Sequence, residues 1–205
     1  MEEQVRFPVG DIMLEGLLSL PAKATQTGVV VCHPHPLYGG EMRNNVVEAM
    51  VVRFQEEGFA TLRFNFRGVG DSGGEHGEGV AEVDDVKAAV GHLLSRCACE
   101  TVVVAGYSFG SMVGLKAGAE DERVTKLIGV ALPIARRDAS FLESVTKPKL
   151  LVSGDRDDHS PVAGLEALGA RLPEPKRLVI VRHADHFFRG LERDVADAAA
   201  RFLDA

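Results

Sequence analysis

Ser108 lies in a pattern that can turn a serine hydroxyl into a nucleophile. Residues 106–110 read Gly-Tyr-Ser-Phe-Gly, which is a G-x-S-x-G pattern. A buried-strand pattern, Thr101–Ala105, precedes it, and a helix pattern with small residues follows at 111–117. The order strand, sharp turn and helix raises the serine above the edge of a sheet, at a helix N-terminus that stabilises an anionic intermediate. We therefore expect Ser108 to act as a nucleophile rather than only to cap a helix.

A nucleophilic serine needs a base, and the base needs an acid that orients it. Three carboxylates, Asp155, Asp157 and Asp158, follow one predicted strand, and two imidazoles, His183 and His186, follow the last one. Both groups lie at the carboxyl ends of strands, where the active sites of α/β proteins collect. The residues alone supply a triad of serine, acid and histidine, and they leave the choice within each group open.

Residues 67–74 contain two further patterns, a second G-x-S-x-G around Ser72 and a G-x-G-x-x-G typical of dinucleotide binding. Dinucleotide binding requires a helix that opens on the glycines and an acid about 20 positions later. Residues 75–79 instead carry two acids and two more glycines, and 88–94 contain no acid. The Ser72 segment resembles the serine motif of chymotrypsin-like proteases, which are all-β and place their His and Asp before the serine. We reject both interpretations.

Histidines at two strand ends suggest a metal site as an alternative. An H-x-H pair and an H-x-x-H pair could together surround an ion that activates water, with Asp157 as a further ligand. The four imidazoles are His33, His35, His183 and His186. Because a proline follows each histidine of the first pair, we favour a rigid loop without a metal, and we expect no cofactor.

Alternating patterns along the chain predict an α/β fold. Strands are predicted at 5–9, 12–20, 28–32, 61–66, 101–107, 124–132, 148–153 and 177–182, and helices at 43–57, 80–94, 108–119, 162–172 and 191–203. A hairpin followed by repeated strand–helix units indicates about eight strands in a mostly parallel sheet with helices on both faces. We expect residues 1–205 to form a single domain.

Composition excludes several classes of partner. The formal charge is −7 and the pI is about 5.5, without a block of basic residues, so neither nucleic acid nor a membrane surface is expected as a partner. The acidic N-terminus is unlike a signal peptide, which favours a cytoplasmic protein. Three cysteines without an export signal argue against a disulfide framework, so Cys32, Cys97 and Cys99 are predicted to be inert thiols.

Taken together, five motifs resemble those of the small, cap-less bacterial α/β-hydrolases, and the resemblance covers nearly all 205 residues. The motifs are Cys32–Gly40, Asn65–Gly74, Gly106–Gly110, Gly154–Asp157 and Ala184–Phe188. The set in this order is far more specific than any one member. The resemblance implies that Asp157 is the acid and His186 the base.

An oxyanion hole is a further implication of this resemblance. It combines the backbone N–H of Phe109 with one from the loop after the third strand. Pro34 and Pro36 have no N–H, so the second donor is His35 or Leu37.

The predicted strands 124–132 and 148–153 are separated by about 15 residues, where many α/β-hydrolases insert a cap. Such a segment holds one short helix, so we expect an open, shallow site for small or flexible acyl substrates. Tyr38 and Arg67 are the candidate substrate-binding residues. Arg67, Arg136 and Arg137 can attract an anionic group on a substrate, although solvated surface charge is the favoured interpretation.

The predicted function is that of a serine hydrolase, monomeric or homodimeric, which cleaves carboxylic esters through an acyl-enzyme on Ser108. Two alternatives remain, a metal-dependent hydrolase and a non-catalytic scaffold with the same fold. A scaffold tolerates loss of the triad, whereas this chain retains Ser108, Asp157 and His186. That retention favours an enzyme.

Overall fold

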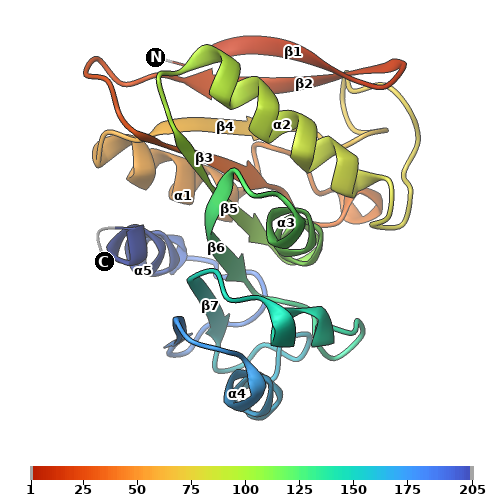
Figure 1. Ribbon diagram of the computed structural model, residues 1–205. Coiled ribbons are helices and arrows are strands. Elements are labelled where there is room, and N and C mark those ends of the chain that lie inside the picture. Colours follow the sequence, from red (N-terminus) through yellow and green to blue (C-terminus); the bar gives the residue numbers. More distant parts are fainter. Residues whose placement is uncertain (1, 204–205) are drawn as a thin grey trace.

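A computed structural model describes residues 2–203, which contain one eight-stranded sheet (Figure 1). Its strands are β1 (Glu3–Val9), β2 (Ile12–Ser19), β3 (Thr27–Cys32), β4 (Ala60–Phe64), β5 (Thr101–Tyr107), β6 (Val124–Val130), β7 (Lys149–Gly154) and β8 (Lys176–Val181). They lie in the order β1-β2-β4-β3-β5-β6-β7-β8, and β2 runs antiparallel to both of its neighbours while the strands from β4 onward are parallel. The predicted α/β-hydrolase fold, with a mostly parallel sheet, is confirmed.

Five α-helices cover the two faces of this sheet. They are α1 (Asn45–Glu56), α2 (Glu82–Arg96), α3 (Phe109–Glu120), α4 (Val162–Arg171) and α5 (Glu192–Leu203). Helices α1 and α5 pack together on one face, and α2, α3 and α4 lie on the other (Figure 1). Within residues 2–203, none of the helices combines the length and the apolar character that a membrane span needs.

The central strands are held by β-branched side chains that are buried on both faces. In β3, Val29 and Val31 face the cluster under α1 and α5, whereas Val30 faces the cluster under α2 and α3. All three are fully buried, and each such side chain contributes about 1.5–3 kcal/mol to stability on transfer from water. The unbroken apolar run that predicted a doubly covered strand is explained by this burial.

The strand order places a topological switch point at the carboxyl edge of the sheet. Strands β3 and β5 are neighbours, but β3 leads through α1 to β4 on one side, and β5 leads through α3 to β6 on the other. The connections therefore diverge above this strand pair. In open α/β sheets such a divergence leaves room for a ligand.

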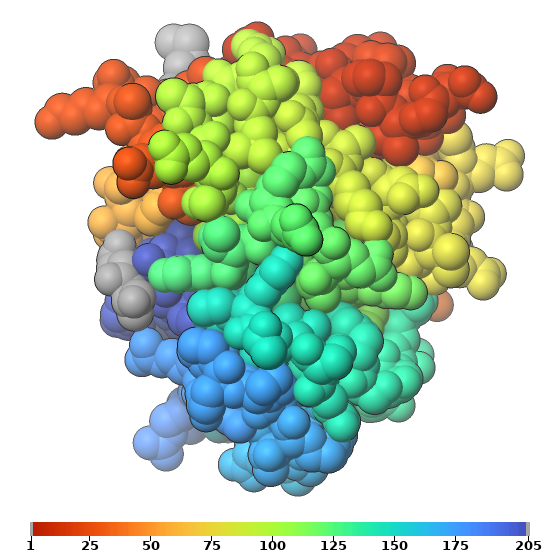
Figure 2. All heavy atoms as spheres, in the orientation of Figure 1, coloured from red at the N-terminus to blue at the C-terminus, as the bar shows by residue number. Residues whose placement is uncertain are grey.

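The segment between β6 and β7 is the position at which many α/β-hydrolases carry a cap. It holds a single short 3₁₀ helix, η2 (Ser140–Ser144). In the space-filling view (Figure 2) the teal surface of this segment lies between the green of α3 and the blue of α4, as part of the same face. The prediction of one short helix and no cap is confirmed for the described residues.

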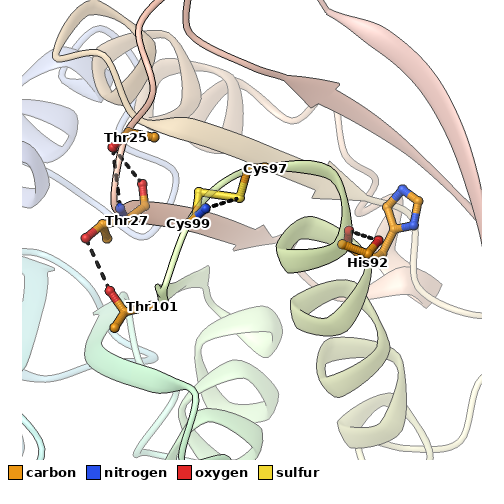
Figure 3. Close-up of a disulfide and its surroundings, with 7 residues drawn as sticks. Thr25, Thr27, His92, Cys97, Cys99 and Thr101 are labelled. Carbon is orange, nitrogen blue, oxygen red and sulfur yellow. Dashed lines mark hydrogen bonds between the residues drawn. A yellow bond between two sulfur atoms is a disulfide. The ribbon is translucent and has the colours of Figure 1, made fainter.

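Cys97 and Cys99 form a disulfide at the opposite, amino edge of the sheet (Figure 3). Helix α2 ends at Arg96, and the turn that follows brings the two Cα atoms to 5.2 Å, within the range a disulfide requires. The prediction that these two cysteines are inert thiols is wrong, because the turn after α2 brings together the sulfur atoms of two residues separated by a single position in the chain. Cys32 remains a free, fully buried thiol, and burial raises its pKa well above the ordinary range.

Candidate active site

Ser108 occupies the turn between β5 and α3. Its backbone dihedral angles are φ 54° and ψ −117°, a region that side chains other than glycine rarely adopt. Two hydrogen bonds hold the turn: the Ser108 N–H donates to Val130 O at 2.8 Å, and Ser111 Oγ donates to Ser108 O at 2.6 Å. The backbone is therefore fixed in the conformation that the sequence pattern predicts.

The two glycines of the pattern are required by close backbone packing. A Cβ on Gly106 would collide with the backbone of Gly110. A Cβ on Gly110 would collide with the carbonyl groups of Cys32 and His33 at the end of β3. Helix α3 can thus begin directly against the neighbouring strand, which places Ser108 at the carboxyl end of β5, beside the end of β3.

Three predicted side chains form a continuous hydrogen-bonded chain. Ser108 Oγ lies 2.9 Å from His186 Nε2, and His186 Nδ1 lies 2.8 and 3.0 Å from the two carboxylate oxygens of Asp157. With Nδ1 donating to the carboxylate, Nε2 is free to accept the serine proton. Serine, acid and histidine come from the ends of β5, β7 and β8, as expected.

Burial explains why Asp157, among three neighbouring aspartates, is the one that orients the histidine. Its side chain is fully buried and also accepts from the N–H groups of His159 (2.8 Å) and Ser160 (3.0 Å). Asp155 and Asp158 are exposed. A buried carboxylate that accepts several charge-assisted bonds is held in one orientation.

The histidine loop is anchored by contacts that sequence reasoning did not identify. Tyr107 Oη donates to His186 O at 2.7 Å, and burial raises the pKa of Tyr107, which keeps its hydroxyl a donor. Arg156 N donates to Ala184 O at 2.9 Å, and a Cβ on Gly154 would collide with the Ala184 backbone. In the sequence, these contacts could have been suspected from two residues: Tyr107, the residue directly before the serine in G-x-S-x-G, and Gly154, the glycine that begins the acid loop.

The alternative histidine faces away from this chain of bonds. His183 is exposed and its Nδ1 lies 3.2 Å from Arg156 Nη2.

The loop after β3 narrows the choice of oxyanion-hole donors. Leu37 N–H donates to His35 Nδ1 at 3.3 Å, and the N–H groups of Tyr38, Gly39 and Gly40 donate to carbonyls within the loop. Among the described residues this leaves His35 N–H without an acceptor. Phe109 N–H lies in the first turn of α3, where a helix supplies no acceptor. These two groups are the candidate donors, and the alternative Leu37 is already engaged.

The His33 side chain is buried at the start of the same loop and makes hydrogen bonds within the protein. Its Nδ1 lies 2.6 Å from Pro34 O, and its Nε2 accepts from Phe66 N–H at 3.0 Å, so both ring nitrogens are engaged. Burial lowers the pKa of His33 to about 4, which keeps the ring neutral. Residues 2–203 bring together no group of three or more side chains with metal-ligand chemistry, so the four-histidine alternative is not assembled.

Arg67 is not available to a substrate, which corrects the sequence-based assignment. Its Nη2 lies 2.6 Å from the fully buried carboxylate of Asp85, and its backbone N–H donates to the same carboxylate at 3.0 Å. These hydrogen bonds to Asp85 raise the pKa of Arg67. The guanidinium charge is therefore already balanced, and the pair ties the loop after β4 to α2.

Three large side chains in the loops that carry the candidate site residues are exposed. Tyr38 and Leu37, on the short helix η1 (Pro36–Tyr38), are 85% and 70% exposed, and Phe187, next to the triad histidine, is 52% exposed. The Tyr38 ring lies 4.9 Å from that of His35. Tyr38 is thus exposed and packs against His35, and its binding of a substrate stays a prediction.

Ser72, in the second G-x-S-x-G pattern, lies apart from the triad. Its hydroxyl donates to Asn65 O at 2.7 Å and accepts from Glu15 N–H at 3.0 Å.

Comparisons with known proteins agree with this architecture. Residues 26–141 match the Hydrolase_4 family, described as serine aminopeptidase, S33. An uncharacterised protein of Rickettsia prowazekii is 31% identical over 98% of this chain and 88% of its own length. An α/β serine hydrolase homologue from Coxiella burnetii has a TM-score of 0.90 at 33% identity, covering 98% of this chain and 97% of its own. A lidless α/β serine hydrolase from Xanthomonas campestris has a TM-score of 0.88 at 30% identity, covering 99% and 94%. The chain belongs to the Hydrolase_4 (serine aminopeptidase, S33) family and has the lidless form of the α/β-hydrolase fold.

Proposed function

We propose that this protein is a serine hydrolase that cleaves carboxylic esters through an acyl-enzyme on Ser108. The observation that carries the proposal is the chain of short hydrogen bonds from Ser108 through His186 to the buried Asp157. A non-catalytic α/β scaffold does not require a serine in a strained backbone conformation that is hydrogen-bonded to a base.

Acylation begins when Ser108 Oγ attacks the ester carbonyl and passes its proton to His186 Nε2. The negative charge on the former carbonyl oxygen is stabilised by the N–H groups of Phe109 and His35. The bond to the leaving group then breaks, and the imidazolium returns the proton to the departing alkoxide. Asp157 stabilises the imidazolium while it carries that proton.

Deacylation repeats the same steps with water as the nucleophile. The water oxygen attacks the acyl-enzyme while His186 takes a proton from the water. His186 then returns this proton to Ser108 Oγ as the carboxylic acid leaves. No cofactor enters either half of the reaction. We further propose that the protein is cytoplasmic, consists of one domain and is either monomeric or homodimeric. Its proposed substrates are small or flexible acyl compounds.

The test is hydrolysis of p-nitrophenyl butyrate by the purified protein and two histidine variants. His186→Ala should lose about 10⁶-fold in kcat, as expected when a triad base is removed. His183→Ala is the matched control and should keep the activity. The opposite pattern would move the base to His183, and loss of activity in a chelator would favour a metal-dependent hydrolase. The family description makes p-nitroanilides of amino acids a second substrate class to compare, and a higher kcat/KM for these would replace the ester assignment with an amidase.

A further inference from the structure

Three arginines, at positions 67, 136 and 137, have different surroundings in the fold. Arg67 is paired with Asp85, and Arg136 is exposed. Arg137 is half-buried, and within residues 2–203 no carboxylate lies within salt-bridge distance of it. Its guanidinium donates one hydrogen bond, at 3.3 Å, to the backbone carbonyl of Glu78. Arg137 is thus a partly desolvated cation whose charge is not balanced by an acid.

Arg137 lies against the side chain of Phe109, whose backbone N–H is proposed to stabilise the oxyanion. Its guanidinium carbon lies 5.5 Å from the centre of the Phe109 ring, and the His35 ring lies 4.8 Å from the same ring. Phe109 and His35 supply the two candidate oxyanion donors through their backbones. The positive charge therefore lies on the Phe109 ring, one side chain away from the backbone N–H groups proposed to hold a substrate carbonyl.

Two other groups complete this corner of the site. The His76 ring lies 5.4 Å from the Phe109 ring and 5.1 Å from the His35 ring, and its Nδ1 is 2.8 Å from the buried carboxylate of Glu82. Glu82 also accepts from the N–H groups of Gly77 and Gly79, at 2.7 and 2.8 Å. The Glu82 carboxylate, the buried acid of this corner, is thus engaged by its own loop and by His76.

The direction of the reaction indicates which part of a substrate would reach Arg137. The leaving group must face His186, because that imidazole protonates it. The acyl chain is the other substituent of the carbonyl carbon and extends away from His186. Arg156 and Arg189 lie in the acid and histidine loops and are exposed; Arg156 contacts His183 and Arg189 lies over the Phe187 ring. Arg137, beside Phe109, is the cation that an acyl chain can approach.

We propose that Arg137 binds an anionic group on the acyl chain, so that the preferred substrates are esters of dicarboxylic acids with one free carboxylate. This inference rests on the proposed esterase function. A guanidinium can hold a carboxylate by two parallel hydrogen bonds, and its place over an aromatic ring limits its competing hydration. The specificity would come from a single side chain.

The test compares an anionic ester, mono-p-nitrophenyl glutarate, with its neutral analogue, p-nitrophenyl pentanoate. The measured quantity is the ratio of the two kcat/KM values. The unchanged protein should favour the anionic ester, and Arg137→Gln should lower the ratio about 10–100-fold, as expected when a hydrogen bond to a charged group is lost. Arg137→Lys should retain part of the preference, and Arg136→Gln, the matched control, should leave the ratio unchanged.

The outcomes separate this inference from the function on which it rests. If both esters are hydrolysed with no preference, or if Arg137→Gln lowers both kcat/KM values equally, the inference is wrong and the esterase function stands. If the unchanged protein hydrolyses neither ester, the proposed function fails and the inference fails with it.

Discussion

Two G-x-S-x-G segments follow strands of the same sheet, one around Ser108 after β5 and one around Ser72 after β4. Ser108 has a positive φ, is partly exposed and faces an imidazole. Ser72 is buried, and both of its hydrogen bonds are made to backbone groups, of Asn65 and Glu15. The two segments show that the same pattern can have different surroundings. Of the two serines, Ser108 combines a strained turn with an imidazole at hydrogen-bond distance, which is what the proposed nucleophile requires.

His33 connects these two regions. Its carbonyl packs against Gly110 in the Ser108 segment, while its ring accepts from Phe66 N–H at the start of the Ser72 loop. The loop around Ser72 is thereby fixed to the end of β3, beside the candidate oxyanion donors. We infer that the Ser72 segment supports the site and does not carry out its chemistry.

The largest expected difference between the two segments is in turnover. Ser108→Ala should lower kcat for p-nitrophenyl butyrate by about 10⁶-fold, because the attacking oxygen is removed. Ser72→Ala should retain turnover but lower the free energy of unfolding by about 1–3 kcal/mol, since Glu15 N–H loses its acceptor. Steady-state kinetics and urea unfolding measure the two effects. A large loss of kcat in a folded Ser72→Ala would break the comparison.

A smaller loss of turnover is expected at the acid. Asp157→Asn should lower kcat about 10⁴-fold, because an amide no longer selects the imidazole tautomer that accepts the serine proton. Asp158→Asn is the control, since this neighbour is exposed and should keep full activity. Equal losses of kcat in the two variants would mean that activity depends on the conformation of the loop rather than on the buried carboxylate of Asp157.

The connection through His33 predicts a pH dependence of stability. Burial lowers its pKa from 6.5 to about 4, so between these pH values the unfolded chain binds a proton that the folded chain does not. The His33 contribution is fully present above pH 6.5 and falls as the pH decreases to about 4, a total of about 3 kcal/mol. Urea unfolding of the protein and of His33→Gln at pH 7.5 and 4.5 measures it, with His183→Gln as control. A pH dependence unchanged in His33→Gln would contradict this account.

Glycines of the two segments give the smallest effect. Gly110→Ala should lower the free energy of unfolding by about 1–3 kcal/mol, because the added methyl group meets the carbonyls at the end of β3. Gly73→Ala should change it by less than about 0.5 kcal/mol, since the nearest atom would be Ile12 Cβ at 3.4 Å. Thermal unfolding of both variants tests the difference, and equal destabilisation would show that the tight turn is not special to Ser108.

Strand and helix positions could be predicted closely, and their boundaries less so. The helix pattern starting at residue 80 becomes α2 from Glu82, because the Glu82 side chain binds the preceding N–H groups of Gly77 and Gly79. The helix pattern at 43–57 becomes α1 from Asn45, since Asn44 accepts from Val46 N–H and caps the helix. The first residue of each of these two helices is set by side-chain hydrogen bonds, which the spacing of apolar residues does not reveal.

Contacts between distant residues were the part of the site that local patterns could not supply. Arg67 and Asp85 are 18 positions apart, and only the packing of α2 against the loop after β4 brings them together. The disulfide depends on where α2 ends, and the choice between His35 and Leu37 depends on a side-chain bond within one turn. A serine, an acid and a histidine were predictable as a group because they follow strands whose ends meet at one edge, whereas the choice of Asp157 and His186 came from the resemblance to the cap-less α/β-hydrolases.

The most direct test of the central claim is to map the site of covalent labelling by a serine-directed fluorophosphonate. The native protein should carry one adduct, on the peptide that contains Ser108. Ser72→Ala should still be labelled, and Ser108→Ala should not. An adduct on Ser72, or labelling that persists in folded Ser108→Ala, would contradict the assignment of Ser108 as the nucleophile.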